Sequence, residues 1–309
     1  MTAYLNAFGF HVPERVVANS ELAARAGCTP EWIESVSGIR ERRWAAPETT
    51  VADLAEAAAR DCLTRAGLEP NQIGLLLLAS GSAEPGFPAP SAELAHRLGL
   101  NLAPAFDLPM ASAGSIFGLA LASQLAEVYG NVLVVAAEKM SAIIEAHALD
   151  RDTAVLFGDG AGAALVSPRP QGHKILGSAL HTDGQFRGDL SYDWKSPLKM
   201  TGLTIILQAS RKLPTVISEV LQAQGMEASA VGAFLVHQAN HNLLTRVAKA
   251  LQVPPERVYS NVGRYGNTSS ASLLIAAAEW SLQSATAEPV VLAGFGAGLH
   301  WGAMVASGI

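Results

Sequence analysis

The chain is poor in cysteine, in charged residues and in aromatic residues, and each shortage excludes a class of protein. Its 309 residues contain two cysteines, Cys28 and Cys62, which are too few for a disulfide framework and lack metal-site spacing. Charged residues make up 16% and aromatic residues 6%, whereas half of all residues are apolar, which excludes intrinsic disorder and coiled coils. We therefore expect a packed α/β protein rich in alanine and glycine.

Two further absences bear on partners and location. The formal charge of −6, from 21 Lys and Arg against 27 Asp and Glu, argues against nucleic acid as a partner, because phosphate backbones require clustered cations. No apolar run approaches the ~20 residues of a membrane-spanning helix. Residues 1–6 lack the basic and apolar segments of a signal peptide. We expect a cytoplasmic protein with no nucleic-acid or membrane partner.

Short apolar runs alternate with helical patterns along the chain. Five runs bounded by turn residues lack strict polar alternation and are typical of strands buried on both faces: residues 73–79, 132–136, 161–166, 233–236 and 290–293. Six stretches between and around them have helical patterns: residues 50–66, 91–98, 115–129, 203–224, 242–251 and 271–284. This alternation predicts crossover connections and a parallel or mixed sheet.

One arrangement occurs twice in the chain. Residues 110–114 and residues 267–271 are both small and hydroxyl-bearing, and each segment leads into an apolar, alanine-rich helix and then a strand. We interpret the repeat as two similar halves, residues 1–167 and residues 168–309, that meet around central buried helices. Chance similarity between alanine-rich helices is the alternative interpretation.

Three polar residues stand beside these elements. Ser112 precedes a buried helix, whose N–H groups and dipole can support a nucleophile and an oxyanion, although serine is also a common helix cap. His237 follows the strand at 233–236, at the end where catalytic residues gather, and could polarise a carbonyl or move a proton. Asn267 either forms a turn and cap or points its amide into the same pocket as His237.

Two other chemistries fit the sequence less well. His237 and His241 are four residues apart, as metal ligands on a helix can be, but no third ligand and no zinc-protease glutamate accompany them. Ser112 also begins half of the nucleophile elbow of α/β-hydrolases. However, Met110 stands where that motif needs glycine, and Pro109 fits poorly in the strand that should precede it. We expect no metal site.

Segments along the whole chain resemble the β-ketoacyl-acyl-carrier-protein synthase III family of the thiolase superfamily. The matching segments are residues 29–33, 37–42, 87–88, 106–114, 156–163, 237–240, 264–269, 294–298 and 301–302. The resemblance implies a thiolase-like, five-layered αβαβα fold of two duplicated halves, normally a homodimer. It also implies a tunnel for the phosphopantetheine arm of coenzyme A or of an acyl carrier protein, so that the substrate carries this group and no separate cofactor is needed.

The resemblance also assigns roles to the three polar residues. In the family a cysteine takes the acyl group, and a histidine and an asparagine stabilise the carbanion formed when a malonyl thioester decarboxylates. His237 and Asn267 fall on that histidine and asparagine, whereas Ser112 occupies the cysteine position. The backbone N–H groups of Ser112 and Ala297 fall on the oxyanion hole. A serine needs a general base as well as the helix dipole, and His237 is the candidate base.

The sequence therefore predicts an acyltransferase of the ketosynthase III type. It would load an acyl group from a coenzyme A or carrier-protein thioester onto Ser112 and then transfer or condense it, as a starter-unit step of polyketide or fatty-acid-like biosynthesis. Because an oxoester is a weaker acyl donor than a thioester, loading is favourable and onward condensation is harder. Two alternatives stay open: a Cys→Ser variant that traps the acyl-enzyme, and a non-catalytic partner subunit of a ketosynthase heterodimer.

The resemblance extends to substrate binding, which it assigns to Trp32, Phe87, Arg151, Phe157 and Asn240, with Trp32 stacking on the adenine of coenzyme A. Val36 and Asn242 stand where arginines usually contact the nucleotide or the carrier. Because a missing arginine removes a bidentate phosphate clamp, we expect weak binding of free coenzyme A thioesters and a donor that arrives on a carrier protein.

Residues 184–207 depart most from the family. Tyr192, Trp194, Met200 and Leu203 in this segment either line an altered acyl pocket or make ordinary core or dimer contacts.

Overall fold

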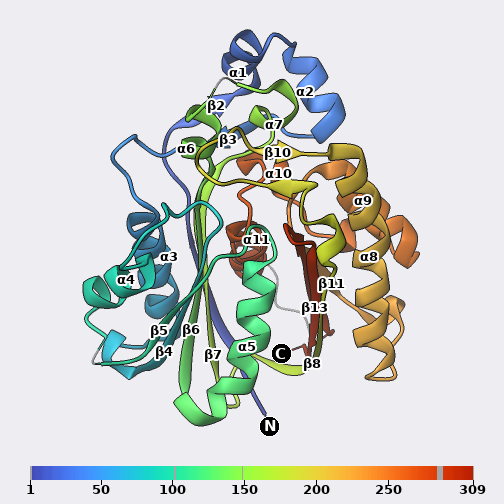
Figure 1. The fold of residues 1–309 in the computed structure, drawn as a ribbon. Coiled ribbons are helices and arrows are strands. Elements are labelled where there is room, and N and C mark those ends of the chain that lie inside the picture. Colours follow the sequence, from blue (N-terminus) through green and yellow to red (C-terminus); the bar gives the residue numbers. More distant parts are fainter. Residues whose placement is uncertain (1, 101, 148, 284–287, 309) are drawn as a thin grey trace.

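Two groups of strands face each other across a pair of central helices (Figure 1). The computed structural model describes residues 2–100, 102–147, 149–283 and 288–308. The first group contains β1 (Tyr4–His11), β4 (Ile73–Ala79), β5 (Ala105–Leu108), β6 (Asn131–Lys139) and β7 (Asp159–Ser167). The second contains β8 (His173–Thr182), β11 (Ala233–Val236), β12 (Val290–Gly296) and β13 (His300–Ala306). Pairing of β1 with β8 joins the groups, so that the strand order is β11-β12-β13-β8-β1-β7-β6-β4-β5.

The helices complete five layers. In Figure 1, α3 (Val51–Ala66) and α4 (Pro90–Leu98) cover the outer face of the first group, and α8 (Gly202–Gln222) with α9 (His241–Leu251) covers the second. Between the groups lie α5 (Gly114–Tyr129) and α11 (Ala271–Gln283), which contact strands of both. This is the αβαβα layering predicted from the sequence.

The central helices can lie between two sheets because they lack a polar face. Every residue of α11 from Ala271 to Trp280 is buried. In α5, Gly114 and Gly118 allow close approach to the sheet, since a Cβ on Gly118 would lie 2.9 Å from Val134 Cγ1. Small residues on these helices therefore set the spacing of the layers.

The shorter elements gather mainly at one end of the sheets, in the upper part of Figure 1. They are β2 (Val16–Ala18), α1 (Asn19–Ala26), α2 (Pro30–Ser37), β3 (Glu41–Arg43), α6 (Met140–Glu145), α7 (Arg151–Ala154), β9 (Leu190–Ser191), β10 (Lys199–Met200) and α10 (Val262–Tyr265). Four 3₁₀ helices, η1 (Pro70–Gln72), η2 (Gly184–Phe186), η3 (Ala228–Ala230) and η4 (Pro255–Arg257), complete the described elements.

The five predicted strands are all present, and the sheet is mixed. The pairs β4–β5, β4–β6 and β11–β12 are parallel, and the remaining neighbours in the large sheet are antiparallel. The sequence analysis missed β1, β5, β8 and β13. β1 and β8 are half-buried rather than continuously apolar, and β5 is only four residues long. Of the predicted helix at 271–284, residue 284 lies outside the described residues.

The repeat noticed in the sequence corresponds to α5 followed by β6, and α11 followed by β12. Residues 1–167 contribute the first group of strands and residues 168–309 the second, with a short connection between β7 and β8. We keep the division at 167/168 as a proposal about two domains, supported by this distribution.

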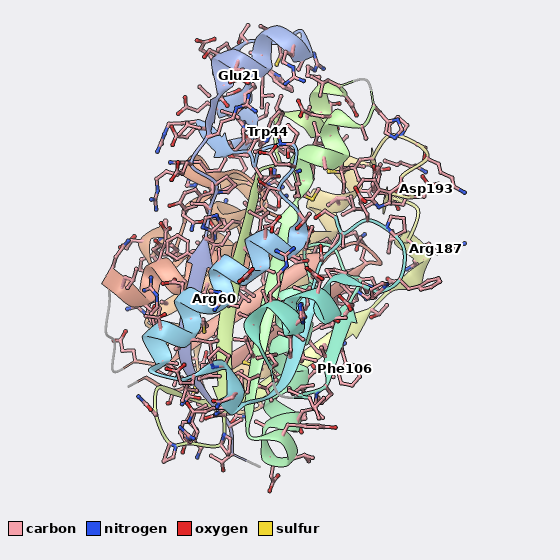
Figure 2. All side chains as sticks on the ribbon, turned by 90° about the vertical axis from the view of Figure 1, so that its left-hand side faces the viewer. Glu21, Trp44, Arg60, Phe106, Arg187 and Asp193 are labelled. Carbon is pink, nitrogen blue, oxygen red and sulfur yellow. The ribbon has the colours of Figure 1, made fainter. Side chains whose placement is uncertain are left out.

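The edge of the first group of strands carries exposed apolar side chains. β5 ends the strand order, and Phe106 on it is 50% exposed at the molecular surface (Figure 2). Leu102 and Phe87, close to β5 and α4 in the chain, are almost completely exposed. Among the described residues, no helix is both long and apolar enough to cross a membrane.

Candidate active site

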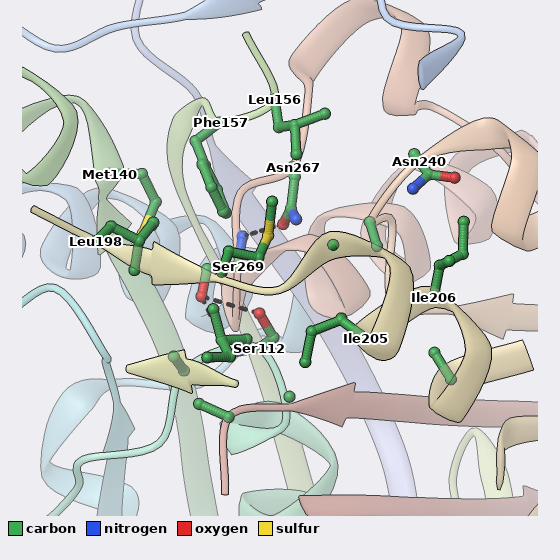
Figure 3. Close-up of a pocket in the computed structure, with 18 of the residues that line it drawn as sticks. Ser112, Met140, Leu156, Phe157, Leu198, Ile205, Ile206, Asn240, Asn267 and Ser269 are labelled. Atoms are coloured by element: carbon green, nitrogen blue, oxygen red, sulfur yellow. Dashed lines mark hydrogen bonds between the residues drawn. The ribbon is translucent and has the colours of Figure 1, made fainter. Parts of the chain in front are cut away.

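A cavity of about 480 Å³ opens beside the central helices, and Ser112, His237 and Asn267 all line it. Ser112 comes from the loop before α5, whereas His237 and Asn267 come from the C-terminal part of the chain. Figure 3 shows Ser112 and Asn267 on either side of Ser269. The structure thus brings together the three residues singled out in the sequence.

Ser112 is not a helix cap. The N-cap of α5 is Ala113, and Ser112 lies before it with a φ of 65°, in the left-handed region that serine rarely adopts. Its N–H donates to Ser269 Oγ at 3.0 Å, and the two hydroxyl oxygens lie 3.3 Å apart (Figure 3). The Ser112 N–H therefore has a hydrogen-bond partner in this structure, and its place in the oxyanion hole stays a prediction.

Two glycines let neighbouring backbone press against the Ser112 loop. A Cβ on Gly296 would lie 2.0 Å from the Ala111 carbonyl oxygen and 2.6 Å from the Ala113 nitrogen. A Cβ on Gly81 would lie 2.7 Å from Ala111 Cα. Both glycines line the cavity, so side chains at these positions would displace the loop that carries Ser112.

Ala297 has the geometry expected of an oxyanion donor. It lines the cavity directly after Gly296, and it is not among the residues with positive φ, so its Cβ is tolerated in the loop. Within the part of the chain that the structure describes, its backbone N–H has no hydrogen-bond partner. Of the two N–H groups predicted for the oxyanion hole, that of Ala297 is the one left free.

His237 is held as a neutral imidazole. The side chain is only 3% exposed, and its Nδ1 lies 2.6 Å from Ser272 Oγ at the start of α11. Burial lowers the pKa of His237 to about 4, although a hydrogen bond with the Ser269 backbone acts in the opposite direction. The hydrogen bond of the Ser112 hydroxyl goes to Ser269 and not to His237.

His241 begins α9, and the described residues contain no group of three potential metal ligands.

Asn267 is oriented by its own loop. Its side-chain Oδ1 accepts the Ser269 N–H at 2.9 Å. Its backbone makes two hydrogen bonds to the residues that flank Phe157. The Asn267 N–H donates to the Leu156 carbonyl oxygen, and the Gly158 N–H donates to the Asn267 carbonyl oxygen. With Oδ1 occupied, the Nδ2 amine is the part of the amide left to donate to a ligand.

A buried carboxylate that the sequence analysis missed supports this arrangement. Glu138, at the end of β6, is completely buried and accepts hydrogen bonds from the Gly81 N–H at 3.0 Å, Ser82 Oγ at 2.5 Å and the Ser270 N–H at 3.1 Å. It therefore ties the end of β6 to the loop after β4 and to the segment that precedes α11. One acidic residue at the end of a continuous apolar strand was the available signal.

The predicted substrate-binding residues divide into two sets. Trp32, Phe157 and Asn240 line the cavity, and Asn240 also caps α9 through Oδ1 and the Leu243 N–H. Arg151 does not line it, but its guanidinium lies 4.8 Å from the centre of the Trp32 ring at the cavity mouth. Phe87 is 98% exposed and lies outside the cavity of this single chain, so its part in substrate binding stays a prediction.

The cavity mouth and the 184–207 segment hold the positions at which the sequence departs from the family. Asn242 Nδ2 donates to the Val36 carbonyl oxygen at 2.9 Å, so a hydrogen bond joins the two positions that lack arginine. Tyr192, Met200 and Leu203 line the cavity. Trp194 does not line it and packs against Tyr192, with ring centres 5.2 Å apart.

Comparisons with known proteins agree with this geometry. Residues 106–184 match the family described as 3-oxoacyl-[acyl-carrier-protein (ACP)] synthase III, and residues 221–307 match its C-terminal counterpart. The β-ketoacyl-[acyl-carrier-protein] synthase III of Gloeobacter violaceus is 40% identical, over 96% of this chain and 96% of that protein.

Two solved structures extend the likeness to the whole fold. The 3-oxoacyl-[acyl-carrier-protein] synthase III of Aquifex aeolicus superposes with a TM-score of 0.94 at 32% identity, covering 99% of each chain. The priming β-ketosynthase of the R1128 polyketide biosynthetic pathway gives a TM-score of 0.92 at 32% identity, covering 99% of this chain and 96% of that one. The thiolase-like fold is thereby confirmed, and the α/β-hydrolase alternative is wrong. The chain belongs to the β-ketoacyl-acyl-carrier-protein synthase III family and is an acyl-transferring enzyme of the ketosynthase type.

Proposed function

We propose that this enzyme loads an acyl group from a thioester onto Ser112 and then condenses or transfers it as a starter unit. The observation that carries the proposal is the shared cavity: a serine hydroxyl, a neutral imidazole and a carboxamide donor line one largely apolar chamber. Similarity to a protein described as a priming β-ketosynthase supports the starter-unit role.

Loading transfers one proton and exchanges one acyl bond. Ser112 Oγ attacks the thioester carbonyl carbon while His237 Nε2 takes the hydroxyl proton, and the Ala297 N–H holds the resulting oxyanion. Collapse of the tetrahedral intermediate breaks the carbon–sulfur bond, and the departing thiolate receives the proton from His237. His237 can act as a base at neutral pH because its lowered pKa keeps it unprotonated.

Condensation uses the same side chains as donors. Loss of carbon dioxide from a malonyl thioester leaves an enolate, whose oxygen can accept hydrogen bonds from Asn267 Nδ2 and His237 Nε2–H. The enolate carbon attacks the acyl-serine carbonyl carbon, the bond from that carbon to Ser112 Oγ breaks, and the departing oxygen takes one proton from solvent water. The Ser272 hydroxyl can either donate to or accept from His237 Nδ1, so it supports the tautomer that each step requires.

The cavity divides at Ser112 into two directions (Figure 3). Met140 and Leu198 are drawn on one side of Ser112, and Ile206 and Asn240 on the other. We assign the phosphopantetheine arm to the Asn240 side, because nearby Asn242 bonds to Val36, an exposed residue that lines the cavity. The acyl group then extends toward Met140 and Leu198, where an uncharged hydrocarbon group suits the apolar lining.

Surface residues bear on which acyl donor the enzyme uses and on how two chains assemble. Arg151 stands beside Trp32 at the mouth, but Val36 and Asn242 supply no guanidinium at the two neighbouring positions where the family usually has arginine. The smaller number of phosphate clamps favours an acyl carrier protein over free coenzyme A as the donor. The exposed apolar residues Phe87, Leu102 and Phe106 at the β5 edge support a homodimer formed through that edge. The cytoplasmic location stays a prediction.

Intact-mass measurement tests the acyl-serine. Incubation of the protein with hexanoyl-carrier protein or hexanoyl-coenzyme A should add one acyl mass to the wild type and none to Ser112→Ala. The matched control is Ser115→Ala, because Ser115 is buried close to Ser112 and its Oγ has no hydrogen-bond partner among the described residues. Absence of an adduct on the wild type, or an adduct on Ser112→Ala, contradicts the proposal.

Adding a malonyl-carrier protein separates the remaining alternatives. A native serine enzyme discharges its acyl adduct into a condensed product. A Cys→Ser trapped variant keeps the adduct, and Ser112→Cys then restores product formation. A non-catalytic subunit forms no adduct with either donor.

A further inference from the structure

Ser269 is the residue that connects the proposed nucleophile to the rest of the site. Its side chain is 1% exposed, and it lies in the loop between Asn267 and the start of α11. Its Oγ accepts the Ser112 N–H, its own N–H donates to Asn267 Oδ1, and its backbone acts to raise the pKa of the neighbouring His237. In the sequence, Ser269 is distinguished only as a member of the matching segment 264–269 and of the repeated segment 267–271.

The Ser112 contact pairs the two hydroxyl groups, and either oxygen can be the donor. Ser269 Oγ uses a lone pair to accept the Ser112 N–H at 3.0 Å, and Ser112 Oγ lies 3.3 Å away. Ser112 Oγ is the only acceptor that the described residues offer to the Ser269 hydroxyl proton. With Ser269 donating, the Ser112 proton points away from Ser269 and is free to be transferred, and charge that develops on Ser112 Oγ is stabilised.

The Ser112–Ser269 hydrogen bond also joins two residues with strained backbones. Ser112 has a φ of 65° and Ser269 a φ of 47°, both in the left-handed region. A left-handed backbone is unfavourable for a residue with a side chain, so it persists only when its surroundings hold it. The Ser112–Ser269 hydrogen bond joins the two strained loops across the two parts of the chain, so each loop holds the other in place.

The Asn267 contact settles the direction of the carboxamide. Because the Ser269 N–H donates to Asn267, the atom it meets must be Oδ1, and the Nδ2 amine takes the opposite orientation. This is the orientation in which Asn267 can donate to an enolate oxygen.

We propose that Ser269 is a positioning residue for acyl loading, with its hydroxyl holding the backbone and hydroxyl of Ser112 in the orientation for attack. The proposal rests on the proposed acyl-serine function.

Two variants remove the hydroxyl with opposite consequences for the backbone. Ser269→Ala retains a side chain that strains the positive φ, whereas Ser269→Gly relieves that strain, so a folding defect would affect them differently. Ser115→Ala removes a buried hydroxyl without a partner and serves as the control. The acylation rate constant and the half-saturating donor concentration are measured for each by rapid quenching and intact mass, with hexanoyl-carrier protein as donor.

We expect both Ser269 variants to acylate about 10- to 100-fold more slowly, with half-saturation unchanged within about twofold and Ser115→Ala equal to the wild type. Wild-type acylation rates in both Ser269 variants would overturn the role of Ser269. So would faster loading because a freed Ser112 N–H now binds the oxyanion. Either result overturns only that role and leaves the proposed acyl-serine function standing. A change confined to half-saturation also overturns the role of Ser269. A wild type that never forms an adduct overturns both this role and the proposed function.

Discussion

The Ser270 hydroxyl donates to the Met110 carbonyl oxygen at 2.5 Å, and this bond joins the segment before α11 to the loop that precedes Ser112. The Ser270 N–H meanwhile donates to Glu138. Consecutive residues, Ser269 and Ser270, thus hold the Ser112 loop from the opposite part of the chain. The position of the nucleophile is a property of the contact between the two halves rather than of either half alone.

Asn267→Asp should separate condensation from loading. Aspartate still accepts the Ser269 N–H, but it places an acceptor oxygen where Nδ2 could donate to an enolate. We expect condensation to fall by roughly 100-fold or more and acyl loading to fall far less. Product formation and adduct formation are measured on the same samples. Equal losses in both steps would show that Asn267 does not act as an enolate donor.

The pH dependence of loading should reflect the buried imidazole. Burial lowers the pKa of His237 from 6.5 to about 4, so the neutral base persists well below neutral pH. The acylation rate should therefore stay level from about pH 7 to about pH 5 and decline only as pH approaches the lowered pKa. Stopped-time mass measurements across this range provide the profile. A decline centred near pH 6.5 would contradict a buried, neutral His237.

The lowered pKa of His237 also makes the folding stability depend on pH. Between pH 6.5 and about 4 the unfolded chain binds a proton at His237 that the folded chain does not, so this contribution is present above 6.5 and lost as pH falls. Asp159 acts oppositely, because burial raises its pKa from 3.8 to about 6, and its contribution is lost as pH rises through that value. Denaturant unfolding of Asp159→Asn and His237→Gln across pH 4 to 7 should therefore show opposite changes in slope relative to the wild type.

Gly296→Ala should disable the site through the backbone. The new Cβ would lie 2.0 Å from the Ala111 carbonyl oxygen, and neither backbone segment can move without shifting Ser112. We expect a loss of about 1–3 kcal/mol in unfolding free energy and little acylation. Gly184→Ala is the control, since nothing lies within 4 Å of its Cβ position. Thermal unfolding and adduct formation are measured for both; a fully active Gly296→Ala would rule out the tight packing of this loop.

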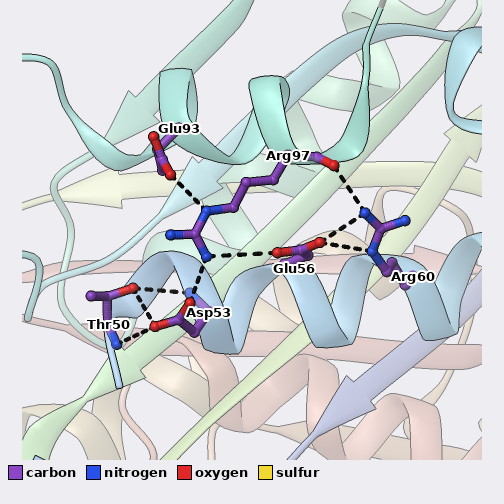
Figure 4. Close-up of polar contacts among 6 residues, drawn as sticks. All are labelled: Thr50, Asp53, Glu56, Arg60, Glu93 and Arg97. Carbon is purple, nitrogen blue, oxygen red and sulfur yellow. Dashed lines mark hydrogen bonds and ion pairs between the residues drawn. The ribbon is translucent and has the colours of Figure 1, made fainter. Parts of the chain in front are cut away.

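The outer layer should depend on salt through Arg97. Arg97 on α4 bonds to Asp53 on α3 at 2.5 Å and to Glu93 at 2.7 Å, and it lies 3.6 Å from Glu56 (Figure 4). We expect Arg97→Ala to lower the unfolding free energy by about 1 kcal/mol at low salt and by less at high salt, because partly exposed pairs are screened.

The matched control for that variant is Arg65→Ala, which removes a single pair, with Asp61, on α3. Denaturant unfolding at low and high sodium chloride concentration gives both values. An Arg97→Ala effect no larger than that of Arg65→Ala, or one independent of salt, would show that the network adds nothing to the individual pairs.

Much of the site followed from local sequence together with family resemblance. His237 was found because it follows an apolar run, and Asn267 because it precedes an apolar helix. Ser269 and Glu138 were not singled out, since a hydroxyl in a serine-rich segment and an acid at a strand end have no local signature of their contacts. The role of Phe87 stays a prediction for the same reason: a motif match does not show whether a side chain faces the cavity or the surface of its own chain.

Chain composition and periodicity alone determined the α/β class, the positions of the most apolar strands and the two central helices, because burial on all sides leaves a continuous apolar pattern. Only the tertiary structure decided which serine touches Ser112, which N–H remains free for an oxyanion and which pKa is displaced. Those properties depend on distances between segments more than a hundred residues apart, and on the exclusion of water where the two halves meet.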